Sequence, residues 1–302
     1  MPNQLLIDKA RELGFIAVGF SKPESPLHFE FFRRWLRDVE LGDISYLRTH
    51  IPIRGDPTKL LEGTNTIISL AYPYPSAKPS TPDGYAASRY STPDQDDYHL
   101  RLRNAGRELS TVVSRLFPGS LTRVCVDTAP ILERSFAAAS GIGFIGKNNM
   151  LIVPGYGSYC YLAEILTTAR FPIPALKERE HECGSCRRCI DSCPTGALKA
   201  PFFLDASRCL SYLTIESKGD IAEETAGKMG NTFFGCDTCQ EVCPFNEQGH
   251  NVVSLPSTGE ILAMNETEFK GTFGKTAFER AGLEKLKSNV RALLTNAWKQ
   301  PM

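Results

Sequence analysis

Eight of the ten cysteines in this 302-residue chain lie between Cys183 and Cys243. They form two runs and one isolated member. The first run begins at Cys183 with the spacing Cys-x2-Cys-x2-Cys-x3-Cys-Pro, and the second begins at Cys236 with the spacing Cys-x2-Cys-x3-Cys-Pro. Cys209 lies between the runs and completes two sets of four. A chain with this pattern has to fold so that its two runs meet, because thiolate-bound metal centres commonly take four cysteines.

The first run has the spacing of bacterial ferredoxins, in which three thiolates bind one 4Fe–4S cluster and the fourth binds a second cluster. Small residues lie between the cysteines, among them Gly184, Ser185, Gly235 and Thr238. Such residues let backbone N–H groups approach the cluster sulfurs. We therefore predict two 4Fe–4S clusters, with ligands that cross between the runs.

Two other uses of cysteine compete with this interpretation. Disulfides suit small secreted domains, whereas this chain is long and 42% hydrophobic. Zinc is the stronger alternative, because paired Cys-x2-Cys units also build zinc sites. Zinc ribbons rarely contain a three-cysteine run that continues into x3-Cys-Pro, so iron–sulfur clusters are favoured.

Charge and hydropathy narrow the class of protein. The formal net charge is zero, so no global basic signature for nucleic acid is present. Residues 270–302 nevertheless contain seven Lys or Arg against two Glu. Such a segment is more often a solvated amphipathic helix than a binding surface. With no long apolar run and no export signal at the N-terminus, we expect a cytoplasmic protein without a membrane span.

Hydrophobic periodicity predicts alternating helices and strands before the cysteine region. Asn3 is expected to cap the first helix, and the long proline-rich stretch 72–97 is expected to be a loop. The expected helices cover 27–41, 98–116 and 128–140, and the expected strands cover 16–20, 66–71, 121–126, 150–153 and 158–166. We predict three parts, 1–175, 176–255 and 256–302, the last of them a basic helical segment.

Glycines at 141, 143 and 146 have the spacing GxGxxG, but they follow a predicted helix and not a strand. A dinucleotide site needs a strand before the glycines and a helix after them, so this match is weak. The loop 141–149 is short of side chains and could lay its backbone against a flat or bulky ligand.

Together with the cysteine runs, several segments resemble epoxyqueuosine reductases, in the same order along the chain. These segments are Val126-Asp-Thr-Ala-Pro-Ile-Leu-Glu-Arg134, Gly141-Ile-Gly-Phe-Ile-Gly-Lys-Asn-Asn149, Tyr156-Gly-Ser158, Leu162-Ala-Glu-Ile165 and Arg208-Cys-Leu-Ser-Tyr-Leu-Thr214. The resemblance extends from about residue 54 to residue 244. Many members carry further helical repeats after the cluster region, so we expect this chain to be a short form.

The resemblance implies an oxidoreductase that reduces the epoxide of epoxyqueuosine in tRNA to queuosine, using cobalamin and two 4Fe–4S clusters. It implies an α+β fold: an α/β-type domain like nitroreductases and corrinoid-processing proteins, followed by a bacterial ferredoxin-like domain. It assigns Cys183, Cys186, Cys189 and Cys243 to one cluster. It assigns Cys193, Cys209, Cys236 and Cys239 to the other.

Asp127 is the predicted catalytic residue. It follows the predicted strand 121–126, and the carboxyl ends of strands in open α/β sheets are where ligands bind. Removing the epoxide oxygen requires a proton, which a carboxyl with a raised pKa can supply. The simpler alternative is that Asp127 caps the helix predicted to follow it; the resemblance favours the acid.

The resemblance also indicates residues that contact cobalamin or tRNA. The cobalamin contacts are Arg54, Tyr90, Asp127, Gly146, Lys147, Asn148, Met150, Ser158 and Ser211. Lys218 is the expected tRNA contact. The motif D-x-H-x-x-G is missing, since Asp97-Tyr98-His99 is followed by Leu102 at the glycine position. We therefore expect no histidine below the cobalt, which makes the metal easier to reduce.

The expected partners are tRNA carrying epoxyqueuosine at the wobble position and a low-potential electron donor such as a ferredoxin or flavodoxin. No membrane partner is expected, and we expect a monomer. Two other functions remain open. One is a corrinoid enzyme like the reductive dehalogenases, and the other is a ferredoxin-type electron carrier without catalysis, which would need neither a corrinoid nor Asp127.

Overall fold

The structure, a computed structural model, describes residues 1–75, 77–93, 97–175, 182–246 and 251–297. It divides into two compact units. The first unit contains Met1–Asp38, Leu47–Pro73 and His99–Cys186, and the second contains Val39–Tyr46, Tyr74–Tyr98 and Arg187–Met302. This packing groups residues differently from the predicted division, because two internal segments and the whole C-terminal part belong to the second unit.

A four-stranded antiparallel sheet is the centre of the first unit, in the order β1-β2-β8-β5. Its strands are β1 (Ala17–Ser21), β2 (Thr66–Pro73), β8 (Cys160–Thr167) and β5 (Thr122–Cys125). All four were predicted within a few residues. Because the sheet is antiparallel, its strands do not end at one common edge where ligands bind, and the position of Asp127 does not by itself indicate a ligand site.

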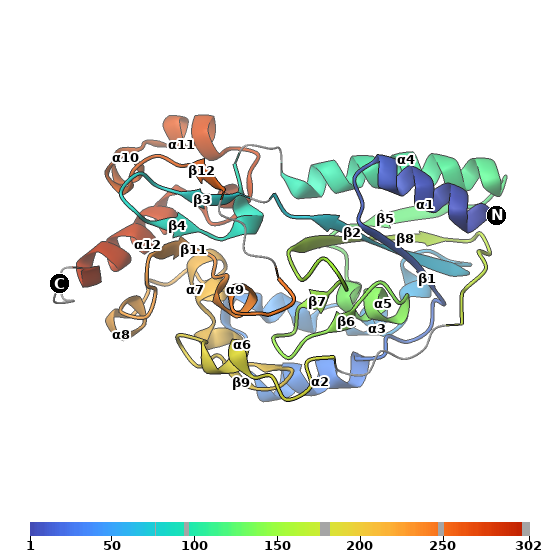
Figure 1. Cartoon of the computed structure of the whole chain (residues 1–302), viewed down its shortest axis with the longest axis horizontal. Helices are drawn as coiled ribbons and strands as arrows, with labels where there is room; N and C mark the ends of the chain where they lie inside the picture. The colour runs from blue at the N-terminus through green and yellow to red at the C-terminus, as the bar shows by residue number, and fades with distance from the viewer. Residues whose placement is uncertain (76, 94–96, 176–181, 247–250, 298–302) are drawn as a thin grey trace. The chain divides into compact units, whose positions relative to one another are not determined.

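Helices cover both faces of this sheet (Figure 1). α4 (Tyr98–Leu116) packs so closely on β5 that a Cβ on Gly106 would lie 2.6 Å from a methyl group of Val124. On the opposite face, α5 (Glu133–Ala139) places Phe136 in a cluster with Ile67 and Leu166. The shorter elements of this unit are α1 (Pro2–Glu12), α2 (Phe29–Asp38), α3 (Ile51–Arg54), β6 (Phe144–Ile145) and β7 (Leu151–Ile152).

Two predicted details of the first unit are wrong. The N-cap of α1 is Met1, and the Asn3 amide donates instead to the carbonyl of Pro172 at 2.8 Å. The helix predicted over 128–140 begins only at Glu133, with Leu132 as its N-cap. Asp127 therefore caps no helix.

The second unit contains short strands within the stretch 72–97 that was predicted to be a loop. β3 (Lys78–Ser80) and β4 (Ala86–Ala87) pair with β12 (Val252–Ser254) and β11 (Thr232–Phe234) to give the sheet β11-β4-β3-β12. The pairings β11–β4 and β12–β3 are parallel. Strands of two or three residues carry no readable period, and their partners lie more than a hundred residues away.

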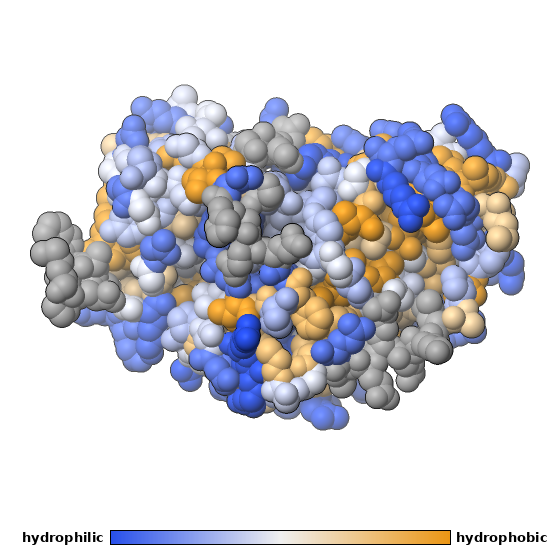
Figure 2. Space-filling view, viewed as in Figure 1, coloured by the Kyte–Doolittle hydropathy of each residue, from blue (hydrophilic) through white to orange (hydrophobic). Residues whose placement is uncertain are grey.

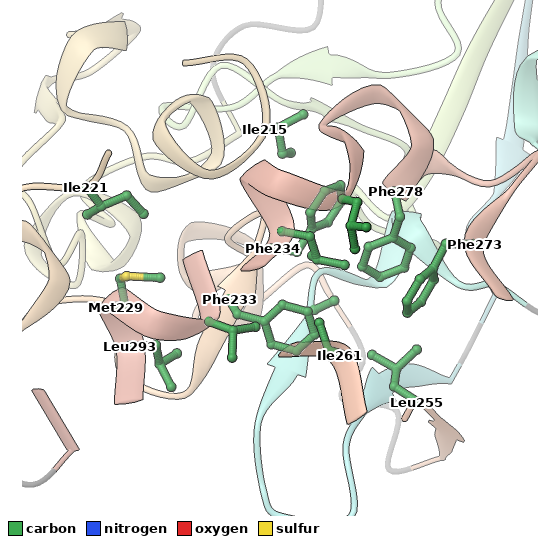
Figure 3. Close-up of a cluster of buried hydrophobic side chains, with 14 of the residues drawn as sticks. Ile215, Ile221, Met229, Phe233, Phe234, Leu255, Ile261, Phe273, Phe278 and Leu293 are labelled. Carbon is green, nitrogen blue, oxygen red and sulfur yellow. The ribbon is translucent and has the colours of Figure 1, made fainter. Parts of the chain in front are cut away.

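Phenylalanines dominate the core of the second unit (Figure 3). The ring centroid of Phe278 lies 4.4 Å from that of Phe234 and 4.6 Å from that of Phe273. Leu286 and Val290 join the same core from α12 (Gly282–Ala297). The C-terminal segment is thus an integral part of this core. Truncating the chain after residue 268 would therefore remove core side chains as well as the positive charges of this segment.

The remaining elements of the second unit are short. They are α6 (Arg188–Asp191), β9 (Leu198–Ala200), β10 (Phe203–Leu204), α7 (Leu210–Ile215), α8 (Glu223–Ala226), α9 (Thr238–Glu241), α10 (Thr258–Ala263) and α11 (Glu266–Phe273). In the described part of the chain, no helix has both the length and the apolar character that a membrane crossing requires. Figure 2 shows a face that is mostly hydrophilic, with hydrophobic residues gathered in several places.

Candidate functional site

Four of the predicted cluster ligands come together in the second unit. Burial raises the pKa of the Cys209 thiol, and the nearby Cys236 and Cys193 raise it further. Burial also raises the pKa of Cys239, to which the proximity of Cys236, Cys209 and Cys189 adds. Cys193, Cys209, Cys236 and Cys239 thus lie near one another, with Cys189 of the other predicted set close to Cys239.

The local structure around these thiols supplies donors to sulfur. Cys209 is the N-cap of α7, and the backbone N–H groups of Ser211 and Tyr212 point at its sulfur and lower its pKa. The Thr238 hydroxyl lies 3.5 Å from the Cys236 sulfur. N–H and O–H donors of this kind stabilise cluster-bound sulfur and help to set its potential.

The other predicted set is divided between the two units. Cys183 and Cys186 belong to the first unit, and Cys189 and Cys243 belong to the second. In the first unit, the Cys186 N–H donates to the Cys183 carbonyl at 2.9 Å and closes a turn. In the second unit, Cys189 lies in α6, and Cys243 follows α9, which packs against α6.

All ten cysteines are free of disulfides. Among the described residues, no group of three or more His, Cys, Asp or Glu converges closely enough to hold one metal ion. Cluster ligands bind separate irons and lie farther apart. Cys125 and Cys160, outside the motif, are buried, and burial raises the pKa of each thiol to about 12.

The glycine loop forms the end of the β6–β7 hairpin. The Gly146 N–H donates to the Met150 carbonyl at 2.8 Å, and the Asn148 side chain accepts the Met150 N–H at 3.2 Å. A Cβ on Gly146 would lie 2.7 Å from Ile152, so no larger residue fits there without a shift. Gly146 and Asn148 are buried, so the glycine is required by packing within the hairpin.

Lys147 extends from this loop to the first cysteine turn. Its Nζ donates to the carbonyl oxygens of Gly184 at 2.5 Å and Cys186 at 2.9 Å. The sequence predicted Lys147 as a cobalamin contact. Its ammonium group bonds the turn that carries Cys183 and Cys186, and the contact with cobalamin stays a prediction.

Asp127 lies in a left-handed turn between β5 and α5, with φ of 53°. Aspartate is one of the few residues other than glycine that adopt this conformation readily. Its N–H donates to Oε1 of Glu133 at 2.7 Å, and its Oδ2 lies 3.1 Å from Nε2 of His99. Its side chain is 49% exposed, so the carboxyl remains accessible to a ligand.

Two further carboxyls lie behind Asp127. Burial raises the pKa of Glu133 to about 7, and the charge of Asp127 raises it as well. Glu164, on β8, is fully buried. Burial raises its pKa well above the usual range, and the neighbouring Glu133 adds to the effect.

The other predicted contacts have varied surroundings. Ser158 is buried just before β8, and Arg54 ends α3 with its guanidinium 5.8 Å from the centre of the Phe32 ring. In the second unit, Tyr90 stacks on Phe234 with ring centroids 6.3 Å apart. Lys218 is exposed there, and its N–H donates to the Asp43 carboxylate at 3.0 Å.

Sequence reasoning missed three residues of this site. In the sequence, His99 stands out only as part of an incomplete corrinoid motif, and nothing there indicates its contact with Asp127. Glu133 and Glu164 fell inside the matched segments without a role. A glutamate in the middle of an otherwise apolar strand was the one available signal for Glu164.

Comparison with known proteins identifies two regions. Residues 182–246 match the family described as a 4Fe-4S double cluster binding domain. Residues 54–128 match the family described as epoxyqueuosine reductase QueG, DUF1730.

Curated relatives match over nearly the whole chain. The epoxyqueuosine reductase of Pseudomonas aeruginosa is 36% identical over 97% of this chain and 85% of its own length. That of Escherichia coli is 33% identical over 95% of this chain and 79% of its own length.

Solved structures of epoxyqueuosine reductases are also similar to this chain. An epoxyqueuosine reductase with a modified tRNA-Tyr stem loop has a TM-score of 0.85 at 32% identity, covering 97% of this chain and 81% of that one. The Bacillus subtilis enzyme, solved with the loop of its catalytic aspartate swung out of the active site, has a TM-score of 0.81 at 30% identity, covering 97% and 81%. A reductive dehalogenase matches with a TM-score of only 0.47 at 15% identity, which carries no functional conclusion.

Proposed function

This chain belongs to the epoxyqueuosine reductase family, and we propose that it reduces the epoxide of epoxyqueuosine in tRNA to the alkene of queuosine. The observation that carries the proposal is 36% identity to a curated family member over 97% of the chain. The reaction consumes two electrons and two protons and releases the epoxide oxygen as water. The chain therefore has to deliver electrons one at a time and supply protons at a fixed position.

The electron path consists of two 4Fe–4S clusters. We assign Cys193, Cys209, Cys236 and Cys239 to one cluster, which is supported by the proximity of Cys236 and Cys193 to Cys209 and of Cys236 and Cys209 to Cys239. We assign Cys183, Cys186, Cys189 and Cys243 to the other. Cys209, of the first set, is half-buried and has backbone N–H donors near its sulfur, which suits a cluster that exchanges electrons with an external protein.

Cobalamin, when bound, supplies a reduced cobalt that can act as a nucleophile or electron donor. Met150, at the end of the β6–β7 hairpin, is partly exposed, so a bulky ligand can reach it there. We propose that Gly146, Asn148 and Met150 hold cobalamin through this loop, with Arg54 and Ser158 from the same unit. From the second unit we propose Tyr90 and Ser211.

Asp127 is our proposed proton donor. Its accessible carboxyl and its contact with the His99 ring support that role, because an imidazole can hold and return a proton. The catalytic aspartate of the Bacillus subtilis enzyme also lies on a loop. We propose that Asp127 is its counterpart.

The tRNA is held by exposed cations, of which Lys218 is our first candidate. A solved relative binds a tRNA stem loop, which supports tRNA as the substrate class. We further propose that a ferredoxin or flavodoxin donates the electrons in the cytoplasm and that the protein acts as a monomer.

Anaerobic reconstitution with iron, sulfide and cobalamin, followed by an absorbance scan and a single-turnover assay on epoxyqueuosine-containing tRNA, tests this function. We expect a corrin band that stays with the protein through gel filtration, and queuosine as the product. Clusters without a retained corrin band and without turnover would indicate the ferredoxin-type electron carrier. A retained corrin without turnover of the tRNA would contradict the proposed substrate.

A further inference from the structure

Glu164 is a carboxyl in the interior of the central sheet of the first unit. On β8 it lies in register with Ser69 of β2 on one side and Cys125 of β5 on the other. It is fully buried, and neither carboxyl oxygen has a hydrogen-bond partner among the described residues. An isolated buried carboxylate is so unfavourable that the group keeps its proton instead. Glu164 is therefore a neutral acid at physiological pH.

Glu133 is the group that this acid faces. It begins α5, on the face of the sheet that also carries Glu164, and each carboxyl affects the pKa of the other. Burial raises the pKa of Glu164 well above its usual range, and the charge of Glu133 raises it further, so Glu164 keeps its proton. A neutral Glu164 does not repel an ionised Glu133.

The Glu133 carboxylate in turn holds the turn at Asp127. Its Oε1 accepts the Asp127 N–H at 2.7 Å, and this bond spans the segment between β5 and α5. The turn has a left-handed residue at Asp127, which needs such support to persist. A hydrogen bond to an ionised acceptor is roughly twice as strong as one to a neutral acceptor. The bond is therefore strongest when Glu133 is ionised.

We propose that Glu133 is a positioning residue for Asp127: its carboxylate holds the left-handed turn through the Asp127 N–H, with the buried Glu164 as a neutral neighbour on the same face of the sheet. The catalytic part of this proposal rests on the proposed function, in which Asp127 delivers the proton. Its structural part, the support of the turn, is independent of catalysis. Glu133 itself need not touch the substrate.

Several other groups face these carboxyls and enter any pH dependence. They are His99 and Arg103 from α4, Arg134 from α5, and Arg123 and Cys125 from β5. Arg134 lowers the pKa of Glu133 and donates to the Asn149 carbonyl at 2.9 Å. The Arg123 guanidinium is held by the Leu60 carbonyl. His99 contacts Asp127, so variants of Glu133 and Glu164 are required to assign an effect to the glutamates.

The test compares Glu133→Gln, Glu164→Gln and Glu164→Leu with the parent and with Glu108→Gln, an exposed glutamate on α4. Reconstituted protein is assayed in single turnovers across a pH range that brackets the Glu133 pKa of about 7. We expect the parent rate to fall as pH drops through this value. Glu133→Gln should lower the plateau by about 10–100-fold through misplacement of Asp127 and abolish this acid limb.

The two Glu164 variants test whether the buried acid is neutral. Glu164→Gln and Glu164→Leu both replace a neutral acid with a neutral side chain, so the acid limb should stay near its parent position in each. An unchanged limb in Glu133→Gln, or a limb that moves to lower pH in both Glu164 variants, would overturn the proposal.

A second readout does not depend on turnover. Amide hydrogen exchange of the segment 126–132 in the reconstituted protein should be faster in Glu133→Gln than in the parent and unchanged in Glu108→Gln. Equal exchange in the parent and Glu133→Gln would overturn the positioning role. If the parent exchanges slowly but reduces no epoxyqueuosine, the proposed function fails while the support of the turn stands.

Discussion

Oδ2 of Asp127 lies 3.1 Å from Nε2 of His99, and this contact joins a left-handed turn to the first turn of α4. The two residues are 28 positions apart in the chain. The pair combines a carboxyl with an imidazole, the two side chains most often used to move protons near neutral pH. It forms the centre of the proposed site in the first unit.

Replacing Cys209 by alanine should remove one cluster and largely spare the other. In the proposed assignment Cys209 belongs with Cys193, Cys236 and Cys239, to which it lies close, and only that set uses it. Anaerobic iron and sulfide analysis should therefore fall from about eight of each per chain toward about four, as expected for cubane clusters. Cys125→Ala is the matched control, because this buried thiol lies outside the motif. Stoichiometric zinc with little iron in the parent would contradict the cluster assignment.

Lys147→Met should shift the potential of the cluster that Cys183 and Cys186 serve. The mutation removes a cation and two donors from the carbonyls of Gly184 and Cys186. Positive charge near a cluster stabilises its reduced form. We expect a more negative potential, by roughly 20–60 mV, which corresponds to roughly 0.5–1.5 kcal/mol for one electron.

A redox titration followed by electron paramagnetic resonance measures this shift. Lys59→Met, a surface lysine paired with Asp56, is the control. Unchanged potentials together with a loss of cobalamin binding would instead support the original prediction that Lys147 contacts the corrinoid.

Lys218→Gln should weaken tRNA binding and reduce its dependence on salt. Each phosphate contact contributes about 0.7–0.9 to the slope of log affinity against log salt. Loss of the one contact should lower the slope by about that amount. Lys22→Gln, which removes an exposed lysine paired with Glu24, should leave the slope unchanged. Equal slopes for Lys218→Gln and the parent, measured by filter binding, would exclude Lys218 as a phosphate contact.

Glu133 should make the fold less stable as pH rises. Its pKa is raised from 4.5 to about 7 in the folded state, so the folded protein binds more protons than the unfolded chain between these values. Stability is therefore highest below the unfolded pKa and falls as pH rises through about 7. A shift of this size corresponds to at most about 3 kcal/mol.

This loss of stability is measured by the thermal midpoint of the reconstituted protein. The midpoint is compared, at one scan rate, between pH values below 4.5 and above about 7. Glu133→Gln should show a smaller fall with pH than the parent, with Glu108→Gln as the control. A parallel fall in Glu133→Gln and the parent would show that Glu133 does not titrate in this range.

Regular features of the chain could be predicted from sequence. Helix α4 occupies 98–116 as its period indicated, and the four central strands lie where apolar runs were found. The cysteine spacing alone indicated the double-cluster region, which the match over residues 182–246 confirms. These features depend on local pattern, which a single sequence carries.

Features that depend on distant partners could not be predicted. β3 and β4 are too short to show a period, and they exist because β11 and β12 pair with them. The start of α5 was misplaced because Asp127 resembles an N-cap, whereas its N–H bonds Glu133 and its turn is left-handed. The His99–Asp127 contact depends on the packing of α4 beside β5, which no spacing in the sequence reveals.

The most direct test of the account is the single-turnover rate of Asp127→Asn. Asparagine tolerates the left-handed turn and keeps the N–H bond to Glu133, so folding, clusters and cobalamin content should match the parent. Alanine would be a poorer choice, because it is strained at this φ. Asp8→Asn on α1 is the matched control.

Asp127→Asn keeps the shape of the side chain but removes its transferable proton and its charge. A positioned general acid contributes ~10²–10⁴-fold in rate, so reduction of epoxyqueuosine in tRNA should slow by an amount in that range. If the variant with full cluster and cobalamin content reduces the epoxide at the parent rate, the proton comes from another group, and Asp127 is not the catalytic acid.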